Sequence, residues 1–253
     1  MVCDWVAGML GLPDTFLGTG TGGGVVQGSA SEAIVTVMVA ARERVVRRVV
    51  EEEGLTMEAG ESKARERRRE DRQMEVRSGL VALGSEQAHS STQKAAANVL
   101  GVRYRVVPAG RATGFRMTGK ALRETLEECR REGLHPFYVT AALGTTGTCA
   151  VDDFEEIAKV KRDWPDLWVH VDAAWAGAAL VCPEMRDAAG AKWLGEFESF
   201  DVNLHKWLLV NFDARSVKIR NLPSTHQKTF LYQTHPSPTF PPPPFCQKKR
   251  TPS

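Results

Sequence analysis

Residues 201–213 read Asp-Val-Asn-Leu-His-Lys-Trp-Leu-Leu-Val-Asn-Phe-Asp, and Lys206 stands near the middle of them. The apolar run that follows Lys206 predicts that this lysine is shielded from solvent. Desolvation favours the neutral, nucleophilic amine over the ammonium, and such an amine can form a Schiff base with an aldehyde. The alternative is a lysine that extends from the end of a strand to reach solvent.

Residues 167–177 read Leu-Trp-Val-His-Val-Asp-Ala-Ala-Trp-Ala-Gly, which predicts a buried strand closed by small residues. Alternation places His170 and Asp172 on one face, with Asp172 at the carboxyl end, where ligands of open α/β sheets bind. A carboxylate there can hold a proton on a heteroaromatic nitrogen. Pyridoxal phosphate requires this pairing, because its aldehyde takes a lysine and its ring nitrogen takes an acidic partner. Taken alone, Asp172 could instead cap a helix after the strand.

The pairing of residues 170–177 with residues 203–213 resembles the pyridoxal-phosphate-dependent group II amino acid decarboxylases, nearest the aromatic L-amino acid decarboxylases. The resemblance extends from about Asp4 to Asp213. It implies an α/β fold with a mostly parallel sheet flanked by helices, as in the large domain of fold type I enzymes. It also implies pyridoxal 5'-phosphate as cofactor, decarboxylation of an aromatic L-amino acid to its amine and carbon dioxide, and a homodimer.

The resemblance assigns roles to individual side chains. His89 is expected to stack on the cofactor ring and to assist catalysis, together with Lys206 and Asp172. The remaining expected cofactor contacts are Ser29, Ala30, Ser31, Thr146, Ala174, Asn203 and His205, of which the three residues 29–31 and the pair Asn203 and His205 are expected near the phosphate.

The composition is that of an ordinary globular protein. The chain has 253 residues, a net charge of +2, 42% hydrophobic residues and 25% charged residues. This charge favours neither a nucleic acid nor an anionic membrane as partner. No apolar run approaches the ~20 residues of a membrane span, and no signal peptide is recognised. We therefore expect a cytoplasmic protein.

The cysteines are odd in number and widely spaced, and they include no Cys-x-x-Cys pair. They are Cys3, Cys129, Cys149, Cys182 and Cys246. This pattern is typical of reduced thiols and predicts no zinc site.

The first part of the chain predicts helices with one candidate anion site. Residues 2–12 have apolar positions at helical spacing, and Ser29 or Ser31 can cap a helix over residues 34–50. The amides at the start of such a helix form a site for a phosphate. A cap without any ligand is the alternative. The glycine-rich residues 18–24 are a weak phosphate-loop signal, because they match no nucleotide-binding spacing.

Charge dominates residues 42–77, and twelve of the seventeen residues in 61–77 are charged. Both signs occur at spacings of three and four residues, which predicts a solvated helix laced with ion pairs. We expect residues 61–77 to be a charged surface insertion within the large domain.

Strand and helix patterns alternate between residues 80 and 180, which predicts a mostly parallel sheet. A strand from Leu80 is expected to lead into a helix that starts at Ser90 or Ser91. The other expected strands cover residues 102–107, 136–142 and 168–172, and the other expected helices cover residues 118–133 and 152–162.

The resemblance ends near residue 214. Residues 1–214 are expected to form a partial large domain, and residues 215–253 a proline-rich tail outside the family. Proline lacks an amide donor, so this tail is expected to add no central strand and to be disordered or polyproline II. Relatives carry an amino-terminal helical segment and a later loop with a catalytic tyrosine, which we do not find here. Dimerisation is expected to be weakened.

Alternative functions remain open from the sequence. One is a catalytically inactive fragment that retains at most cofactor binding. Others are an aromatic aldehyde synthase, a histidine decarboxylase or a glutamate decarboxylase, since the loop that separates decarboxylation from aldehyde synthesis is not recognised. A metal-dependent hydrolase that uses His170, Asp172 and His205 is a further alternative.

Overall fold

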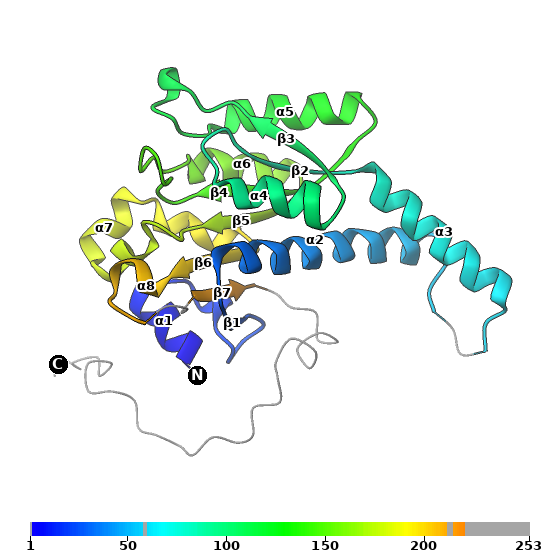
Figure 1. The fold of residues 1–253 in the computed structure, drawn as a ribbon, viewed down its shortest axis with the longest axis horizontal. Helices are drawn as coiled ribbons and strands as arrows, with labels where there is room; N and C mark the ends of the chain where they lie inside the picture. The colour runs from blue at the N-terminus through cyan, green and yellow to red at the C-terminus, as the bar shows by residue number, and fades with distance from the viewer. Residues whose placement is uncertain (1, 58–59, 212–214, 221–253) are drawn as a thin grey trace, which may run out of the picture. The chain divides into compact units, whose positions relative to one another are not determined.

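The structure, a computed structural model, describes residues 2–57, 60–211 and 215–220. Within these residues a seven-stranded sheet has the order β1-β7-β6-β5-β4-β2-β3 (Figure 1). The strands are β1 Gly23–Gln27, β2 Leu80–Ser85, β3 Arg103–Val107, β4 His135–Ala142, β5 Trp168–Asp172, β6 Ser199–Asn203 and β7 Arg215–Ile219.

Strands β3, β2, β4, β5 and β6 are parallel to one another, whereas β7 runs antiparallel to both β6 and β1. The predicted mostly parallel α/β sheet is therefore confirmed. The expectation that no central strand follows residue 214 is wrong, because β7 lies inside the sheet and is buried along its length. Its five residues precede the prolines and find partners on both sides. Residues 221–253, with the predicted polyproline segment, lie outside the described residues, as do Phe212 and Asp213.

The helices lie between the strands as the sequence predicts. They are α1 Val2–Leu10, α2 Ala30–Glu52, α3 Lys63–Gly79, α4 Ser90–Lys94, α5 Gly119–Arg131, α6 Phe154–Asp163, α7 Pro183–Ala188 and α8 Leu204–Trp207. The predicted helix over residues 118–133 is α5: Thr118 caps it, and Leu122 and Leu126 are fully buried. The predicted strand over residues 168–172 is β5, residue for residue.

Two hydrophobic clusters pack against the two faces of the sheet. One contains side chains of α1, α5 and α6 together with Val169 and Val171 of β5. The other contains side chains of α2 together with Trp168 of β5 and Val217 of β7. Successive strand residues point to opposite faces, so His170 and Asp172 lie on the face that α2 covers. No helix in the described ranges has the length and apolarity needed to cross a membrane.

The charged residues 61–77 form most of α3, which packs on α2 (Figure 1). Arg69 is the only residue of α3 that is buried. Arg72 of α3 bonds Glu53 at 2.7 Å, and Arg77 bonds Glu43 at 3.0 Å. The prediction of a solvated helix with ion pairs is confirmed, while its status as an insertion stays a prediction.

Candidate active site

A cavity opens at the carboxyl ends of the parallel strands, where the fold class predicts a ligand site. It is bounded by residues from the start of α2, from the segments after β2, β4 and β5, and from α8. Its lining consists of Ala30, Gln87, Ala88, His89, Thr140, Ala142, Gly144, Thr145, Thr146, Asp172, Ala174, Trp175 and Lys206. Six of the ten residues predicted for the site therefore meet at one cavity.

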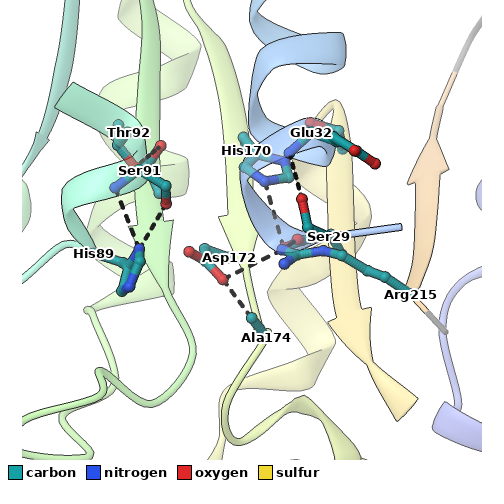
Figure 2. A network of polar contacts seen from close by, with 12 residues as sticks. Ser29, Glu32, His89, Ser91, Thr92, His170, Asp172, Ala174 and Arg215 are labelled. Carbon is teal, nitrogen blue, oxygen red and sulfur yellow. Dashed lines mark hydrogen bonds and ion pairs between the residues drawn. The ribbon is translucent and has the colours of Figure 1, made fainter. Parts of the chain in front are cut away.

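Asp172 is the last residue of β5, and its side chain is 11% exposed at the cavity. Its Oδ1 accepts a hydrogen bond of 3.0 Å from the amide of Ala174 (Figure 2). The next helical segment, a 3-10 turn, begins only at Gly177, so the carboxylate caps no helix. The geometry agrees with the ligand-facing interpretation of Asp172 and not with the capping alternative.

His89 lies at the cavity as the N-cap of α4. Its Nδ1 accepts from the amide of Ser91 at 3.2 Å and lies 2.8 Å from the Ser91 hydroxyl (Figure 2). Two contacts at Nδ1 fix the plane of the imidazole ring. The helix predicted to start at Ser90 or Ser91 does so at Ser90, and it continues as a π-helical turn over Ala95–Val99.

Lys206 lies on the four-residue helix α8, directly after β6. Its Nζ is 5.8 Å from the centre of the Trp175 ring, which makes a cation–π contact. The expectation that Lys206 is shielded from solvent is wrong, because the residue is exposed. The apolar run after it does not fold over the amine: Leu209 is 96% exposed. The lysine therefore reaches the cavity from its open side.

The turn after β4 brings backbone and hydroxyl groups to the cavity. Thr145 and Thr146 line it, and Gly144 has a φ of +81°. A Cβ at Gly144 would lie 2.3 Å from the Cβ of Ala176, so only glycine fits this approach. Asp152 holds this turn in place, because its carboxylate accepts hydrogen bonds of 2.7 Å from the amides of Ala142 and Met117.

The start of α2 lies on the same side of the site. Ser29 is the N-cap, and its hydroxyl accepts from the amide of Glu32 at 3.2 Å (Figure 2). Ser29 therefore caps the helix, as predicted, and the phosphate site at the same helix start stays a prediction. Ala30 reaches the cavity lining, and the first-turn amides of α2 have no acceptor within the helix.

Four predicted contacts do not belong to the cavity lining found among the described residues. These are Ser29, Ser31, Asn203 and His205. Asn203, the last residue of β6, is buried, and its Oδ1 has no hydrogen-bond partner in the described part of the chain. His205 is half-buried on α8.

A buried group of charges adjoins Asp172. Nη2 of Arg215, on β7, lies 3.7 Å from Oδ1 of Asp172 and contacts the carboxylate of Asp201, on β6. The Arg215 and Asp201 side chains are both 0% exposed. Burial lowers the pKa of Arg215 to about 10, although Asp172 opposes this shift. The guanidinium thus remains charged at neutral pH.

His170 completes this group as a neutral residue. Burial lowers the pKa of His170 to about 3, with Asp172 acting in the opposite direction. Its Nδ1 lies 2.9 Å from the Ser199 hydroxyl, and its Nε2 lies 3.4 Å from Oδ1 of Asp201. The ring stacks against Tyr138 at 6.2 Å between centroids. His170 therefore supports the floor of the site and adds no charge to it.

The sequence interpretation missed Arg215, Asp201 and Tyr138. A basic residue inside the alternating pattern of residues 215–219 is a signal for the first, because a strand there would bury it. The metal-dependent alternative has no geometric support. Within residues 2–57, 60–211 and 215–220, no three His, Cys, Asp or Glu side chains form a group that could hold a metal ion.

Comparison with known proteins places this geometry in a family. Residues 1–237 match the family described as "Pyridoxal-dependent decarboxylase conserved domain". The chain belongs to the pyridoxal-dependent decarboxylase family. The match continues past residue 214 and includes β7. The fold is accordingly that of the fold type I pyridoxal-dependent decarboxylases, as the sequence motifs predict.

Individual family members are similar over most of the chain. The aromatic-L-amino-acid decarboxylase of Sus scrofa is 42% identical over 224 residues, which are 87% of this chain and 41% of that protein. The histidine decarboxylase of Drosophila melanogaster is 40% identical over 245 residues, which are 93% of this chain and 26% of that protein. The crystal structure of Oryza sativa TDC with PLP is 32% identical, with a TM-score of 0.72 over 87% of this chain and 43% of that one. The chain thus spans less than half the length of these family members.

Proposed function

We propose that the protein acts in the pyridoxal-phosphate-dependent decarboxylation of an aromatic L-amino acid, which yields the amine and carbon dioxide. The observation that carries this proposal is the meeting of Asp172 and Lys206 at one cavity, on the carboxyl ends of adjacent strands. The similarity to the aromatic-L-amino-acid decarboxylase of Sus scrofa supports the substrate class.

The residues at the cavity fit the cofactor. With both carboxylates ionised, Asp172 and Asp201 face one buried guanidinium, that of Arg215, so the group has one negative charge in excess. A buried charge is costly unless it is paired, and Asp172 is the member of the group that borders the cavity. A protonated ring nitrogen beside Asp172 would balance it.

When bound, pyridoxal phosphate supplies an aldehyde for a lysine amine and a ring that accepts the electron pair left as carbon dioxide departs. In this proposal Lys206 provides the amine and Asp172 holds the proton on the ring nitrogen. His89 is held at the cavity by its contact with Ser91, and it would stack on the ring face.

The phosphate is proposed to lie against the start of α2. A helix amino terminus offers free amides and the positive end of the helix dipole. Ala30 already borders the cavity, while Ser29 precedes it as the N-cap and Ser31 follows it in the first turn. Thr146 and Ala174, which line the cavity, are proposed further cofactor contacts, together with Asn203 and His205 at the end of β6.

The assembly and location are further proposals. We infer a homodimer, as the resemblance implies, and a cytosolic protein, since the four cysteines of the described residues are free. Histidine is the second candidate substrate, because a histidine decarboxylase matches 93% of the chain at 40% identity.

The proposal is tested by release of labelled carbon dioxide from carboxyl-labelled aromatic amino acids and histidine, with the cofactor supplied. We expect release from the aromatic substrates, and loss of most of it in Asp172→Asn, because a neutral amide cannot stabilise the charged ring nitrogen. Asp187→Asn, an exposed site on α7, is the control. Equal rates for Asp172→Asn and the unmodified chain would contradict the assignment.

A further inference from the structure

Arg215 is a buried cation beside the site. It projects from β7 on the face that α2 covers and crosses β6 to reach β5 (Figure 2). The sheet register explains this reach. Arg215 stands opposite Asn203, and Asp201 stands opposite Asp172, so these side chains share one face of three adjacent strands.

The contacts of Arg215 are divided between two carboxylates. Its Nη2 lies 3.7 Å from Asp172 Oδ1, and the same nitrogen contacts Asp201 Oδ2. The guanidinium charge is therefore shared between two carboxylates, with Asp201 in direct contact and Asp172 farther away.

We propose that Arg215 is a positioning residue that divides its charge between Asp201 and Asp172, and thereby sets how firmly Asp172 can hold a proton on the ring nitrogen of bound pyridoxal phosphate. This inference rests on the proposed function. Arg215 acts through Asp172, and Asp201 restrains Arg215.

The two neighbours of Asp172 act in opposite directions on that proton. A cation within ~4–6 Å opposes a second positive charge and shifts a pKa by about one to three units. Arg215 thus weakens the hold on the ring proton. Asp201 draws the guanidinium away from Asp172 and strengthens it.

The other groups near Asp172 do not supply a charge that could take over the effect of Arg215 and Asp201 on the ring proton. Burial lowers the pKa of His170 to about 3 and raises the pKa of Tyr138 above its usual value, so both stay neutral near pH 7. Lys206 and His89 also line the cavity. In the proposed arrangement they act at the aldehyde and at the ring face, not at the ring nitrogen.

The test is the nitrogen NMR signal of pyridoxal phosphate labelled with ¹⁵N in the ring, bound to the full chain at matched pH. We expect Arg215→Met to move the signal toward the protonated position, with the proton affinity of the ring nitrogen rising roughly tenfold. Asp201→Asn should move it the other way, because the freed guanidinium then pairs fully with Asp172. A purely structural role would give shifts of the same sign, or none.

Further variants keep the result interpretable if Arg215→Met fails to fold. Arg215→Met places an unpaired carboxylate in the interior, so Asp201→Asn is also compared with the double variant Asp201→Asn/Arg215→Met, which should move the signal toward the protonated position. Arg215→Lys should keep the signal of the unmodified chain. Lys218→Met is the matched control, because Lys218 is a buried cation of the same strand that lies 3.5 Å from Asp4 instead.

The outcomes separate this inference from the proposed function. Labelled cofactor that binds, with a signal that Arg215→Met leaves unchanged in both backgrounds, would overturn the inference alone. Shifts of equal size in Lys218→Met would overturn it as well. Failure of the unmodified chain to retain the cofactor would overturn the proposed function, and the inference with it.

Discussion

The helix pair α2–α3 and the strands β5, β6 and β7 are both rich in charge, but they bury it differently. In the helix pair, Arg72 and Glu53 lie 2.7 Å apart, and their side chains are 32% and 38% exposed. In the strands, Arg215 and Asp201 are in contact with no exposure at all. Water screens the charges of Arg72 and Glu53. The charges of Arg215 and Asp201 are cut off from water, so each is stabilised by the protein groups around it. Burial, and not the number of charges, should decide what each pair contributes.

The largest difference is expected for the buried pair. Asp201→Ala removes the carboxylate in direct contact with buried Arg215, leaves that cation only the more distant Asp172 and opens a cavity, so it should lower the free energy of unfolding by about 3–5 kcal/mol. Urea unfolding followed by circular dichroism measures this loss. Asp201→Asn, which keeps the volume of the side chain, separates the lost charge from the cavity. A loss below about 1 kcal/mol would mean that the pair behaves like a surface contact.

An intermediate effect on stability is expected for Asp152, a buried carboxylate that accepts hydrogen bonds from backbone amides and forms no ion pair among the residues that the structure describes. Burial raises the pKa of Asp152 to about 7, against the opposing hydrogen bonds from two amides. The folded state then binds this proton more tightly than the unfolded state, whose pKa is near 3.8. The contribution to stability is therefore fully present below about pH 4 and is lost as the pH rises toward 7.

Unfolding midpoints measured from pH 4 to pH 8 test this pH dependence. We expect a shallower slope between pH 4 and 7 for Asp152→Asn than for the unmodified chain. Asp153→Asn is the matched control, because Asp153 is the half-buried N-cap of α6 and asparagine also caps helices well. Parallel slopes for Asp152→Asn and the unmodified chain would show that Asp152 is not the group responsible.

The smallest effect is expected on α3. Burial alone would raise the pKa of Glu43, but bonds from Arg77 and Arg42 outweigh it and hold that pKa below its usual value. The pair is partly exposed, so Arg77→Gln should lower the free energy of unfolding by less than about 1 kcal/mol. The loss should shrink further in 1 M salt. A salt-independent loss of several kcal/mol would remove the distinction between the two regions.

The same contrast explains what the sequence could predict. The charged helix α3 and the strand β5 follow from local patterns, charge at helical spacing in one and alternating apolar residues in the other. Strand β7 could not be predicted in this way, because it forms by pairing with β6 and with β1, and β1 lies far away in the sequence. Local proline content pointed away from it.

The site was predictable where a motif fixes both residue and position. Asp172, His89, Thr146 and Lys206 meet at the cavity as the motifs indicate. The exposure of Lys206 was not predictable, because it depends on where the following residues pack. The place of Arg215 beside Asp172 depends on the register of three strands, which a single sequence does not state.

We propose that Asp172 and Lys206 together hold the cofactor in this chain. The most direct measurement is the visible absorption spectrum after incubation with pyridoxal phosphate and dialysis, for the unmodified chain and for Lys206→Ala. We predict a visible band that survives dialysis and is absent from the variant. No band in folded, unmodified protein, or an equal band in Lys206→Ala, would contradict the account.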